Sequence, residues 1–509
     1  MYFGGEYFAE WLPRVAPLRD NQPVTSHETY LAADLGAGSG RVMAGAFDGE
    51  RLKLEEVHRF QNPSVRLLDS LHWDALHLFE EIKRGMHRAA EQKPVSVGVD
   101  TWGVDFALLD PTGALIGNPY HYRDSRKNGA MARAFDVVPK QEIFDHTGIQ
   151  FMEINTLYQL FAMKGGPQLE RADRLLMMPD LFHYWLTGIQ VCELTDASTT
   201  QFYDPRKKTW ASELLDRLGL PSSILGGLVG PGTKIGELRS TVAHETGLGA
   251  MQVVAPGGHD TASAVAAVPA ASEDWAFLSS GTWSLLGAET GRPYVTEEAL
   301  ERNFTNEAGV AGTTRLLTNI PGMWLLEECR RHWAQSGHAP SYEEIVHGAQ
   351  SAEAFKSLID VDDPSFEAPD DMPARLQAWC RAHDQHEPET PGEFARMIFE
   401  SLALRYRRGL DDLAAITGKR AKTLHIVGGG SRNALLSQFA ADACQVEVVT
   451  GPVEATAAGN VLIQAMGMGR IDGVEQLREV VRRSFEPKRF APKGDGARWE
   501  EAAARLGAM

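Results

Sequence analysis

Two segments, one in each half of this 509-residue chain, share an order of residue types that restricts the fold more than any other feature. Residues 29–49, TYLAADLGAGSGRVMAGAFDG, contain an apolar run, a glycine-rich turn and a second apolar run. Residues 275–290, WAFLSSGTWSLLGAET, repeat this order with hydroxyl-bearing residues in the turn. Each segment predicts a strand, a small-residue turn and another strand. Two such hairpins indicate duplicated domains that face each other across a cleft.

The first turn, Gly36 to Gly40, reads G-x-G-x-G and is a candidate phosphate site. Backbone N–H groups converge on a phosphate most readily where side chains at Gly36, Gly38 and Gly40 do not block its approach. The spacing differs from the G-x-G-x-x-G of a dinucleotide-binding turn, and residues 41–44 continue as a strand. GLVGPGTK at 227–234 has Thr where a Walker A loop needs Lys. Taken alone, the turn also fits an ordinary tight hairpin.

A second candidate site is APGGHDTASAVAAV, residues 255–268, where two glycines precede an Ala- and Val-rich helix. Asp260 stands at the start of that helix and fits two roles. One is the N-terminal capping residue of the helix. The other is a general base, because the carboxyl ends of strands form the usual ligand edge of an α/β sheet. This segment alone leaves both roles open.

Three further features favour a phosphorylated ligand. Thr282 in SSGTWS can present its hydroxyl and neighbouring N–H groups to an anion. Asp34, at the end of the first strand, can hold Mg²⁺ through water. Residues 428–430 are all glycine and leave a flat backbone surface for a base or ribose. With the two hairpins and Asp260, they indicate ATP-dependent phosphoryl transfer with Mg²⁺, since such catalysis is mainly positioning and charge stabilisation.

Composition excludes several classes of partner. Fifty Lys and Arg against 68 Asp and Glu give a net charge of −18, which opposes binding to nucleic acid or to an anionic membrane. The four cysteines contain no C-x-x-C, which favours a reducing cytoplasm over a disulfide framework. No apolar run approaches the roughly 18 residues that would span a membrane. We expect a cytoplasmic protein, monomeric or weakly dimeric, that binds small molecules.

The chain is long enough for two domains. Short strand-like runs alternate with helical patterns throughout, which predicts an α/β fold. The segment AAVPAASED, residues 266–274, interrupts this alternation just before the second hairpin. We therefore predict an N-terminal extension (1–28), a first domain (29–268), a second domain (269–470) and a C-terminal tail (471–509).

Eight segments resemble, in order and spacing, the FGGY carbohydrate kinases of the sugar kinase/actin-like superfamily. They are DLGAGSGRVMAG, VGVDTWGVDFALLD, YRDSR, NTLYQL, MPDLFHYWLTG, HDTASAV, LSSGTWSLLG and LHIVGGGSRN. The resemblance runs from about residue 29 to about residue 470. It implies two actin-like, ribonuclease H-like ATPase domains that face each other across a catalytic cleft, with a sugar and ATP as substrates.

The resemblance also implies roles for residues that match the family's motifs. Asp260 is expected to be the proton acceptor for the sugar hydroxyl. Sugar contacts are expected from Gly103, His259, Asp260, Thr261 and Asn319. Nucleotide contacts are expected from Ala37, Gly38, Ser39, Gly40, Arg41, Thr282, Glu327 and Gly429. Glu327 departs from the family, which commonly has Gln there as a nucleotide contact.

The segments DTWGVDF and YRDSR favour L-rhamnulose, phosphorylated at O1, as the acceptor. They add Trp102, Asp105, Arg123 and Asp124 as candidate sugar contacts. L-Fuculose, L-ribulose, D-xylulose and glycerol stay as alternatives, because a few hydrogen bonds decide polyol recognition. An ATP-binding chaperone or filament protein would use the same cleft without needing the polar HDTAS site. A glycoside hydrolase would leave the glycine hairpins without a role.

Overall fold

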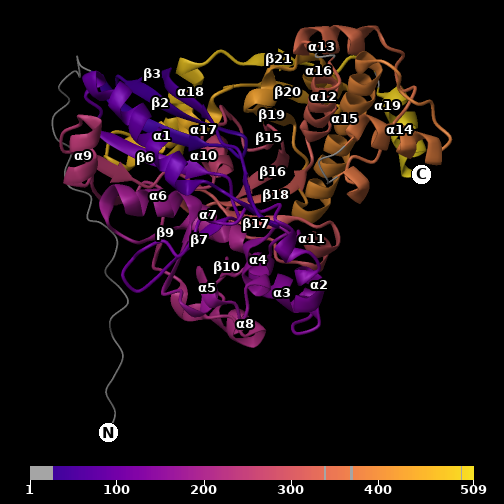
Figure 1. The fold of residues 1–509 in the computed structure, drawn as a ribbon. Helices are drawn as coiled ribbons and strands as arrows, with labels where there is room; N and C mark the ends of the chain where they lie inside the picture. The colour runs from indigo at the N-terminus through magenta and orange to yellow at the C-terminus, as the bar shows by residue number, and fades with distance from the viewer. Residues whose placement is uncertain (1–26, 338–339, 367–370, 495, 509) are drawn as a thin grey trace.

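The computed structural model describes residues 27–337, 340–366, 371–494 and 496–508, which form two sheet-based domains (Figure 1). One large sheet lies in each half of the chain, six-stranded in the first and seven-stranded in the second, and the other sheets of the described residues are two-stranded. The α/β prediction is therefore confirmed. Residues 1–26 of the predicted extension lie outside the described residues, and β1 begins at Glu28.

The first sheet has the strand order β13-β14-β6-β1-β2-β3. Its strands are β1 (Glu28–Leu35), β2 (Ser39–Phe47), β3 (Leu52–Gln61), β6 (Ser96–Thr101), β13 (Lys234–Glu237) and β14 (Gln252–Val254). β1 pairs antiparallel with β2, with Asp34 opposite Arg41, and parallel with β6, with Asp34 beside Asp100. The register thus brings two aspartates to the carboxyl edge of the sheet.

The second sheet has the strand order β17-β18-β16-β15-β19-β20-β21. Its strands are β15 (Trp275–Ser280), β16 (Ser284–Thr290), β17 (Thr305–Ala308), β18 (Thr314–Ile320), β19 (Thr423–Val427), β20 (Glu447–Thr450) and β21 (Lys488–Phe490). β15 is antiparallel to β16 and parallel to β19, just as β1 is to β2 and β6. The predicted repetition of the hairpin is confirmed.

Helices surround both sheets (Figure 1). Those near the first sheet include α1 (Ala75–Arg88), α6 (Met178–Thr187), α9 (Ser240–Thr246) and α10 (Asp260–Ala266). Those of the second half include α12 (Trp324–Gln335), α13 (Tyr342–Ser351), α14 (Met372–Ala382), α15 (Pro391–Thr417), α16 (Ala434–Cys444) and α17 (Ala455–Gly467). Each hairpin of the repeat is therefore held in a sheet that helices cover.

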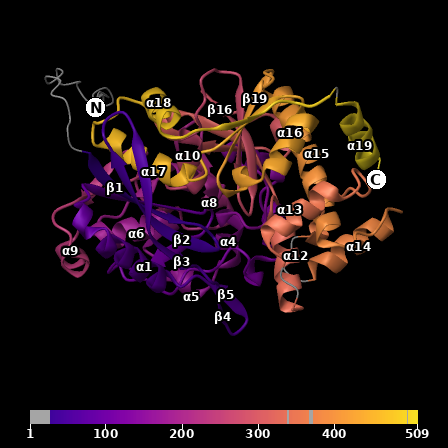
Figure 2. The same cartoon turned by 90° about the horizontal axis from the view of Figure 1, so that it is seen from above.

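Helix α17 comes from the second half of the chain but packs on the first sheet. Its Gln464 Nε2 donates to the carbonyl oxygen of Leu31 in β1, at 2.8 Å. Figure 2 shows α17 beside α10, between β1 and β16. The two helices cross so closely that a Cβ at Gly459 would lie 1.8 Å from the carbonyl oxygen of Ser263. This crossing joins the two domains.

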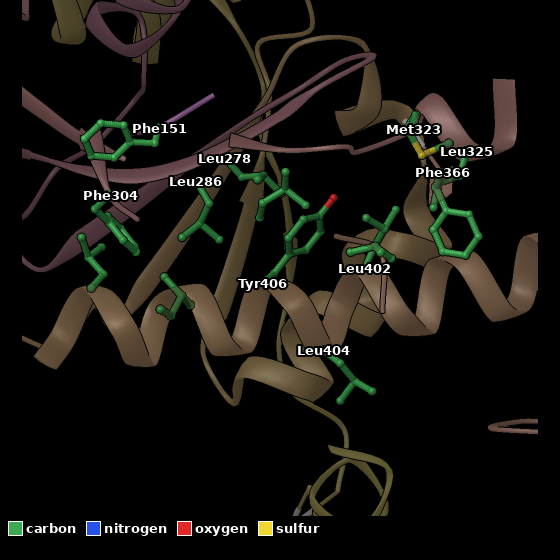
Figure 3. Close-up of a cluster of buried hydrophobic side chains, with 14 of the residues drawn as sticks. Phe151, Leu278, Leu286, Phe304, Met323, Leu325, Phe366, Leu402, Leu404 and Tyr406 are labelled. Carbon is green, nitrogen blue, oxygen red and sulfur yellow. The ribbon is translucent and has the colours of Figure 1, made fainter. Parts of the chain in front are cut away.

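Helix α15 packs against the second hairpin. It begins with a capping box between Thr390 and Glu393, which satisfies free backbone N–H groups at the start of the helix. Figure 3 shows Tyr406 of α15 close to Leu278 of β15 and Leu286 of β16. The hydroxyl of buried Tyr406 lies 3.0 Å from that of Ser284, the first residue of β16. The apolar cluster thus fixes the strands that carry the second turn.

Residues 471–508 contain regular structure, although we predicted a tail there. They include α18 (Val474–Ser484), β21 and α19 (Ala497–Gly507), and β21 pairs antiparallel with β20. The four cysteines are buried and free, as expected from their spacing. Among the helices of the described residues, none combines the length and the apolar character needed to cross a membrane.

Candidate active site

A cavity of about 470 Å³ lies between the two domains and is lined from both. The two hairpin turns, the start of α10 and part of the glycine run 428–430 meet there. Most of the predicted site residues line it: Asp34, Ala37, Ser39, Arg41, Gly103, His259, Asp260, Thr261, Thr282, Asn319 and Gly429. Gly38, Gly40 and Glu327 are not among the lining residues. The fold thus gathers residues that are up to about 400 positions apart in the chain.

The first hairpin turn is closed by a hydrogen bond from Gly36 N to the Ser39 carbonyl oxygen, at 2.9 Å. The second turn repeats it, from Gly281 N to the Trp283 carbonyl oxygen, at 2.8 Å. At Gly40 the structure differs from our interpretation. A Cβ there would lie 2.4 Å from the Phe60 ring, so packing on β3 explains this glycine better than the approach of a phosphate.

Arg41 links the two sides of the cavity. Its Nε and Nη2 donate to Asp34 Oδ2 at 3.0 and 2.8 Å, and its Nη1 pairs with Glu454, which precedes α17. Arg59 and Arg432 also line the cavity. Each of these three arginines is paired with a carboxylate, Arg41 with Asp34 and Glu454, Arg59 with Glu56 and Arg432 with Glu454. Their guanidinium groups are donors that a nucleotide phosphate can use once it competes with those carboxylates.

Asp260 is the first residue of α10, and His259 is the capping position, with no side-chain capping bond. The capping role for Asp260 is therefore wrong. Its side chain is 32% exposed and lines the cavity, where its Oδ1 accepts a hydrogen bond from the Thr261 hydroxyl at 3.0 Å. Burial raises the pKa of Asp260, and the charge of Asp34 adds to this, against the opposing effect of His259. Asp260 is placed to take a proton from a bound hydroxyl.

Asp100 is a buried aspartate that the sequence analysis missed, and it lies beside a lining residue without lining the cavity itself. It is fully buried beside Asp34, and its Oδ1 has no hydrogen-bond partner among the described residues. Burial raises the pKa of Asp100, and the charges of Asp34 and Asp260 raise it further. Its signal was its place at the end of an apolar strand in VSVGVD, the same context as that of Asp34.

Asp34 lines the cavity and can hold a divalent cation through water, with the carboxylate of Asp100 beside it. Burial is the main cause of the raised pKa values of Asp100 and Asp260, and the charge of Asp34 adds to both. The described residues contain no group of three or more His, Cys, Asp or Glu side chains that could hold a metal ion by themselves. Mg²⁺ keeps several waters and needs only one or two carboxylates when phosphates supply the other ligands.

The cavity lining includes an apolar wall and an amide pair. Trp102, Tyr122 and Ile154 contribute to the wall. Asn319 of β18 donates to Gln150 Oε1 from both its backbone N and its Nδ2, at 3.0 and 2.9 Å. The sequence analysis did not find this interdomain contact, and both of its residues line the same cavity as the apolar side chains. The combination suits a small polyol that also has an apolar part.

Asp105, Arg123 and Asp124 do not line the cavity, although we expected them to contact the sugar. Asp105 is fully buried and accepts hydrogen bonds from Trp73 Nε1 at 2.5 Å, Trp102 Nε1 at 3.0 Å, Tyr122 N at 3.1 Å and Gln159 Nε2 at 2.8 Å. Burial raises the pKa of Asp105 to about 6. Arg123 lies over the Trp324 ring at 3.9 Å. Asp105 and Arg123 thus pack behind the wall.

We expect Asp105→Asn to raise the KM for the sugar and to lower the free energy of unfolding by about 1–3 kcal/mol. The amide would turn an N–H toward the buried donors that Asp105 now accepts from. Urea unfolding and initial rates measure the two effects. Asp204→Asn is the matched control, because Asp204 is also buried and does not line the cavity. An equal sugar KM in the two variants would contradict this role.

Glu327 lies on the exposed face of α12, where its carboxylate pairs with Arg330 at 3.0 Å. Its charge is therefore balanced outside the cavity. Thr282 lines the cavity, and its carbonyl oxygen accepts from Trp324 N at 3.1 Å. A Cβ at Gly430 would lie 2.0 Å from Ser280 Oγ, so the glycine run packs directly on the second hairpin.

Comparisons with known proteins agree with this geometry. The model of the FGGY family of carbohydrate kinases matches residues 29–267 for its N-terminal domain and 276–468 for its C-terminal domain. A rhamnulokinase from Bacteroides thetaiotaomicron is 46% identical over 93% of this chain and 98% of its own length. A rhamnulokinase from Pectobacterium atrosepticum is 42% identical over 92% of this chain and 94% of its own length.

The fold is also found in solved structures. A ligand-bound xylulose kinase from Lactobacillus acidophilus superposes with a TM-score of 0.78 at 16% identity, covering 94% of this chain and 97% of that one. The two-domain architecture is thus shared with sugar kinases of very different sequence. On these grounds, the chain belongs to the FGGY family of carbohydrate kinases.

Proposed function

We propose that this protein transfers the γ-phosphoryl group of ATP to O1 of L-rhamnulose, giving L-rhamnulose 1-phosphate and ADP. The observation that carries the proposal is the position of Asp260, which lines the same cavity as both hairpin turns. The names of the relatives at 46% and 42% identity support the choice of sugar.

In the proposed reaction, Asp260 accepts the proton of the O1 hydroxyl. The sugar oxygen then forms a bond to the γ-phosphorus, and the bond from that phosphorus to the β–γ bridging oxygen breaks, releasing ADP. Mg²⁺, held through Asp34, would neutralise charge on the phosphates. The turns at residues 36–39 and 281–283, with Arg41, orient the phosphates in line with O1. Gly429 and Thr282 contact the nucleotide.

The sugar occupies the end of the cavity formed by Gly103, His259, Thr261 and Asn319. L-Rhamnulose is a 6-deoxy ketose, so one end of it is a methyl group, which suits the wall at Trp102. This feature separates it from L-ribulose, D-xylulose and glycerol, which have hydroxyls throughout. L-Fuculose shares the methyl group and is therefore the most informative alternative acceptor.

The test is a coupled ADP-release assay with Mg²⁺-ATP across L-rhamnulose, L-fuculose, L-ribulose, D-xylulose and glycerol. We expect the highest kcat/KM with L-rhamnulose and no ADP release above background without a sugar. A preference for another acceptor would show that this protein phosphorylates a different sugar from the one proposed. ADP release independent of any acceptor would contradict sugar phosphorylation.

We expect kcat to fall as the pH is lowered, with an apparent pKa above the ordinary aspartate value of about 3.9. A general base acts as the carboxylate. Because burial raises the pKa of Asp260, protonation begins at a higher pH, and activity is lost as the pH falls through that value. The measurement is kcat at saturating substrates across pH, with thermal unfolding at each pH as the control. A constant kcat down to about pH 4 in folded protein would contradict it.

We further propose that the protein works as a monomer or weak homodimer in the cytoplasm. One chain supplies the cavity lining from both domains, so a second copy is not needed to complete the site.

A further inference from the structure

A chain of side-chain amides runs from the second domain into the first along the active cavity. Gln150 Oε1 accepts from Asn319 N and Nδ2, at 3.0 and 2.9 Å. The backbone carbonyl oxygen of Gln150 accepts from Asn155 Nδ2 at 2.8 Å, and Asn155 Nδ2 also donates to Gln201 Oε1 at 2.9 Å. Gln201 Nε2 donates to the Ile149 carbonyl oxygen at 3.2 Å. The first-domain amides of this chain are all buried.

Backbone groups determine which way each amide points. The N–H of Asn319 can only donate, so the oxygen of Gln150 must face it. A backbone carbonyl can only accept, so Asn155 must turn its nitrogen toward Gln150, and Gln201 must turn its nitrogen toward Ile149. The orientation of all three amides therefore follows from the main chain.

This orientation leaves one donor and one acceptor without a protein partner. They are Gln150 Nε2 and Asn155 Oδ1, and both atoms are open to solvent, unlike the enclosed polar atoms of the described residues that lack a partner. Gln150 and Asn155 are only 7% and 4% exposed, and both line the active cavity. The cavity is therefore faced by a fixed N–H donor and a fixed oxygen acceptor.

The position of Asn155 in its helix supports a role in binding. It is the capping residue of α4 (Thr156–Ala162), where an asparagine oxygen usually accepts from a backbone N–H of the first helical turn. Asn155 makes no such bond. Its nitrogen is used in the amide chain and its oxygen stays free, so the stability of α4 does not explain this orientation.

The amide pair lies at the part of the cavity proposed for the sugar. Gln150 bonds directly to Asn319, which is an expected sugar contact. Thr156, the first residue of α4, donates from its hydroxyl to the Val104 carbonyl oxygen at 2.7 Å. Val104 follows Gly103, the other expected sugar contact on this side. The amide chain thus connects the segments that carry both contacts.

We propose that Gln150 and Asn155 are specificity-determining residues for the acceptor sugar. Gln150 Nε2 donates to one sugar oxygen, and Asn155 Oδ1 accepts from one sugar hydroxyl. The identity of the sugar rests on the proposed function. Neither amide can turn over without losing its bonds to the main chain, so a hydroxyl in the wrong configuration leaves a donor or an acceptor unpaired. The pair therefore discriminates between L-rhamnulose and L-fuculose, which differ only in configuration at C4.

Gln150→Glu tests the donor. Glutamate keeps an oxygen toward Asn319 N and replaces the NH₂ group with an oxygen of similar size, so the contact with the second domain stays and the donor is lost. We expect kcat/KM for L-rhamnulose to fall about tenfold or more and that for L-fuculose to fall less, with the KM for ATP within about twofold of wild type. Gln150→Met, which adds no charge, should change the ratio of the two sugars in the same direction.

Gln385→Glu is the matched control. Gln385 Oε1 also accepts from a backbone N–H, that of Leu358 at 2.8 Å, and its Nε2 donates to the Leu358 carbonyl oxygen at 2.6 Å. Gln385 does not line the active cavity. This control should lower the thermal stability without changing the ratio of the two sugars. The inference is overturned if both Gln150 variants lower kcat/KM for the two sugars by the same factor, or if they change only stability.

A second readout does not depend on catalysis. Isothermal titration calorimetry with L-rhamnulose, without a hydrolysable nucleotide, should show a Kd raised about tenfold in Gln150→Met and in Asn155→Leu, which has a similar shape but no acceptor. Gln385→Glu should bind the sugar as the wild type does. An unchanged Kd in either cavity variant would overturn the inference for that residue. If the variants weaken sugar binding but the wild type releases no ADP with any sugar, the proposed function fails and the sugar contacts stand.

Discussion

Asp260→Asn is expected to lower kcat for L-rhamnulose by about 100-fold or more while leaving the fold intact. Asparagine has nearly the same shape, and its oxygen can still accept the hydrogen bond that Thr261 now donates. It cannot accept the proton of the sugar hydroxyl. Initial rates at saturating ATP and sugar measure the loss, and the KM for ATP should change little because the proposed phosphate contacts lie on the hairpins.

Asp204→Asn serves as the control for this substitution, since it replaces a buried aspartate outside the cavity and should keep kcat near wild type. Thermal unfolding of both variants separates lost chemistry from lost structure. A folded Asp260→Asn protein with wild-type turnover would remove Asp260 from its role as the base.

Gly459→Ala is expected to destabilise the protein by about 1–3 kcal/mol or more, and to lower kcat as well. The added Cβ would lie 1.8 Å from the Ser263 carbonyl oxygen, so α10 and α17 must move apart. Asp260 is the first residue of α10, so this movement displaces the proposed base. Urea unfolding and kcat are the measurements.

Gly507→Ala is the control, because Gly507 is also a helical glycine, the last residue of α19, but has open space around its Cβ position. Replacing a helical glycine with alanine usually stabilises by about 0.5–1 kcal/mol. The two variants should therefore change stability in opposite directions. If Gly459→Ala also stabilises the protein, the contact between α10 and α17 leaves room for a methyl group at position 459, which contradicts the prediction.

The hairpins and Asp260 were predictable because their signals are local. The order of apolar runs and small residues determines strand, turn and strand, and the glycines before Asp260 mark the start of a helix. The pairing register between strands, in contrast, depends on residues far apart in the chain. Asp100 was found beside Asp34 only once β6 was placed parallel to β1.

Side-chain direction limited the prediction at the sugar end. Trp102 and Asp105 are three positions apart in one motif, but only Trp102 lines the cavity. The Asp105 side chain points into the protein interior, where its carboxylate accepts hydrogen bonds from buried N–H groups. Arg315 of β18 had no signal, since a lone arginine in a strand of the second half does not predict its contact with His259 of the first, at 3.2 Å. Its position follows from how the two sheets meet.

The equivalent strand directions in the two sheets mean that one chain uses the same strand arrangement twice, with one hairpin in each domain. The two domains supply different groups to the cavity, because the first carries Asp260 and the second carries part of the glycine run. They also depend on each other there, since Asn319 of β18 in the second domain donates to Gln150 of the first. A change in the cavity at this contact would therefore require compensating substitutions in both domains.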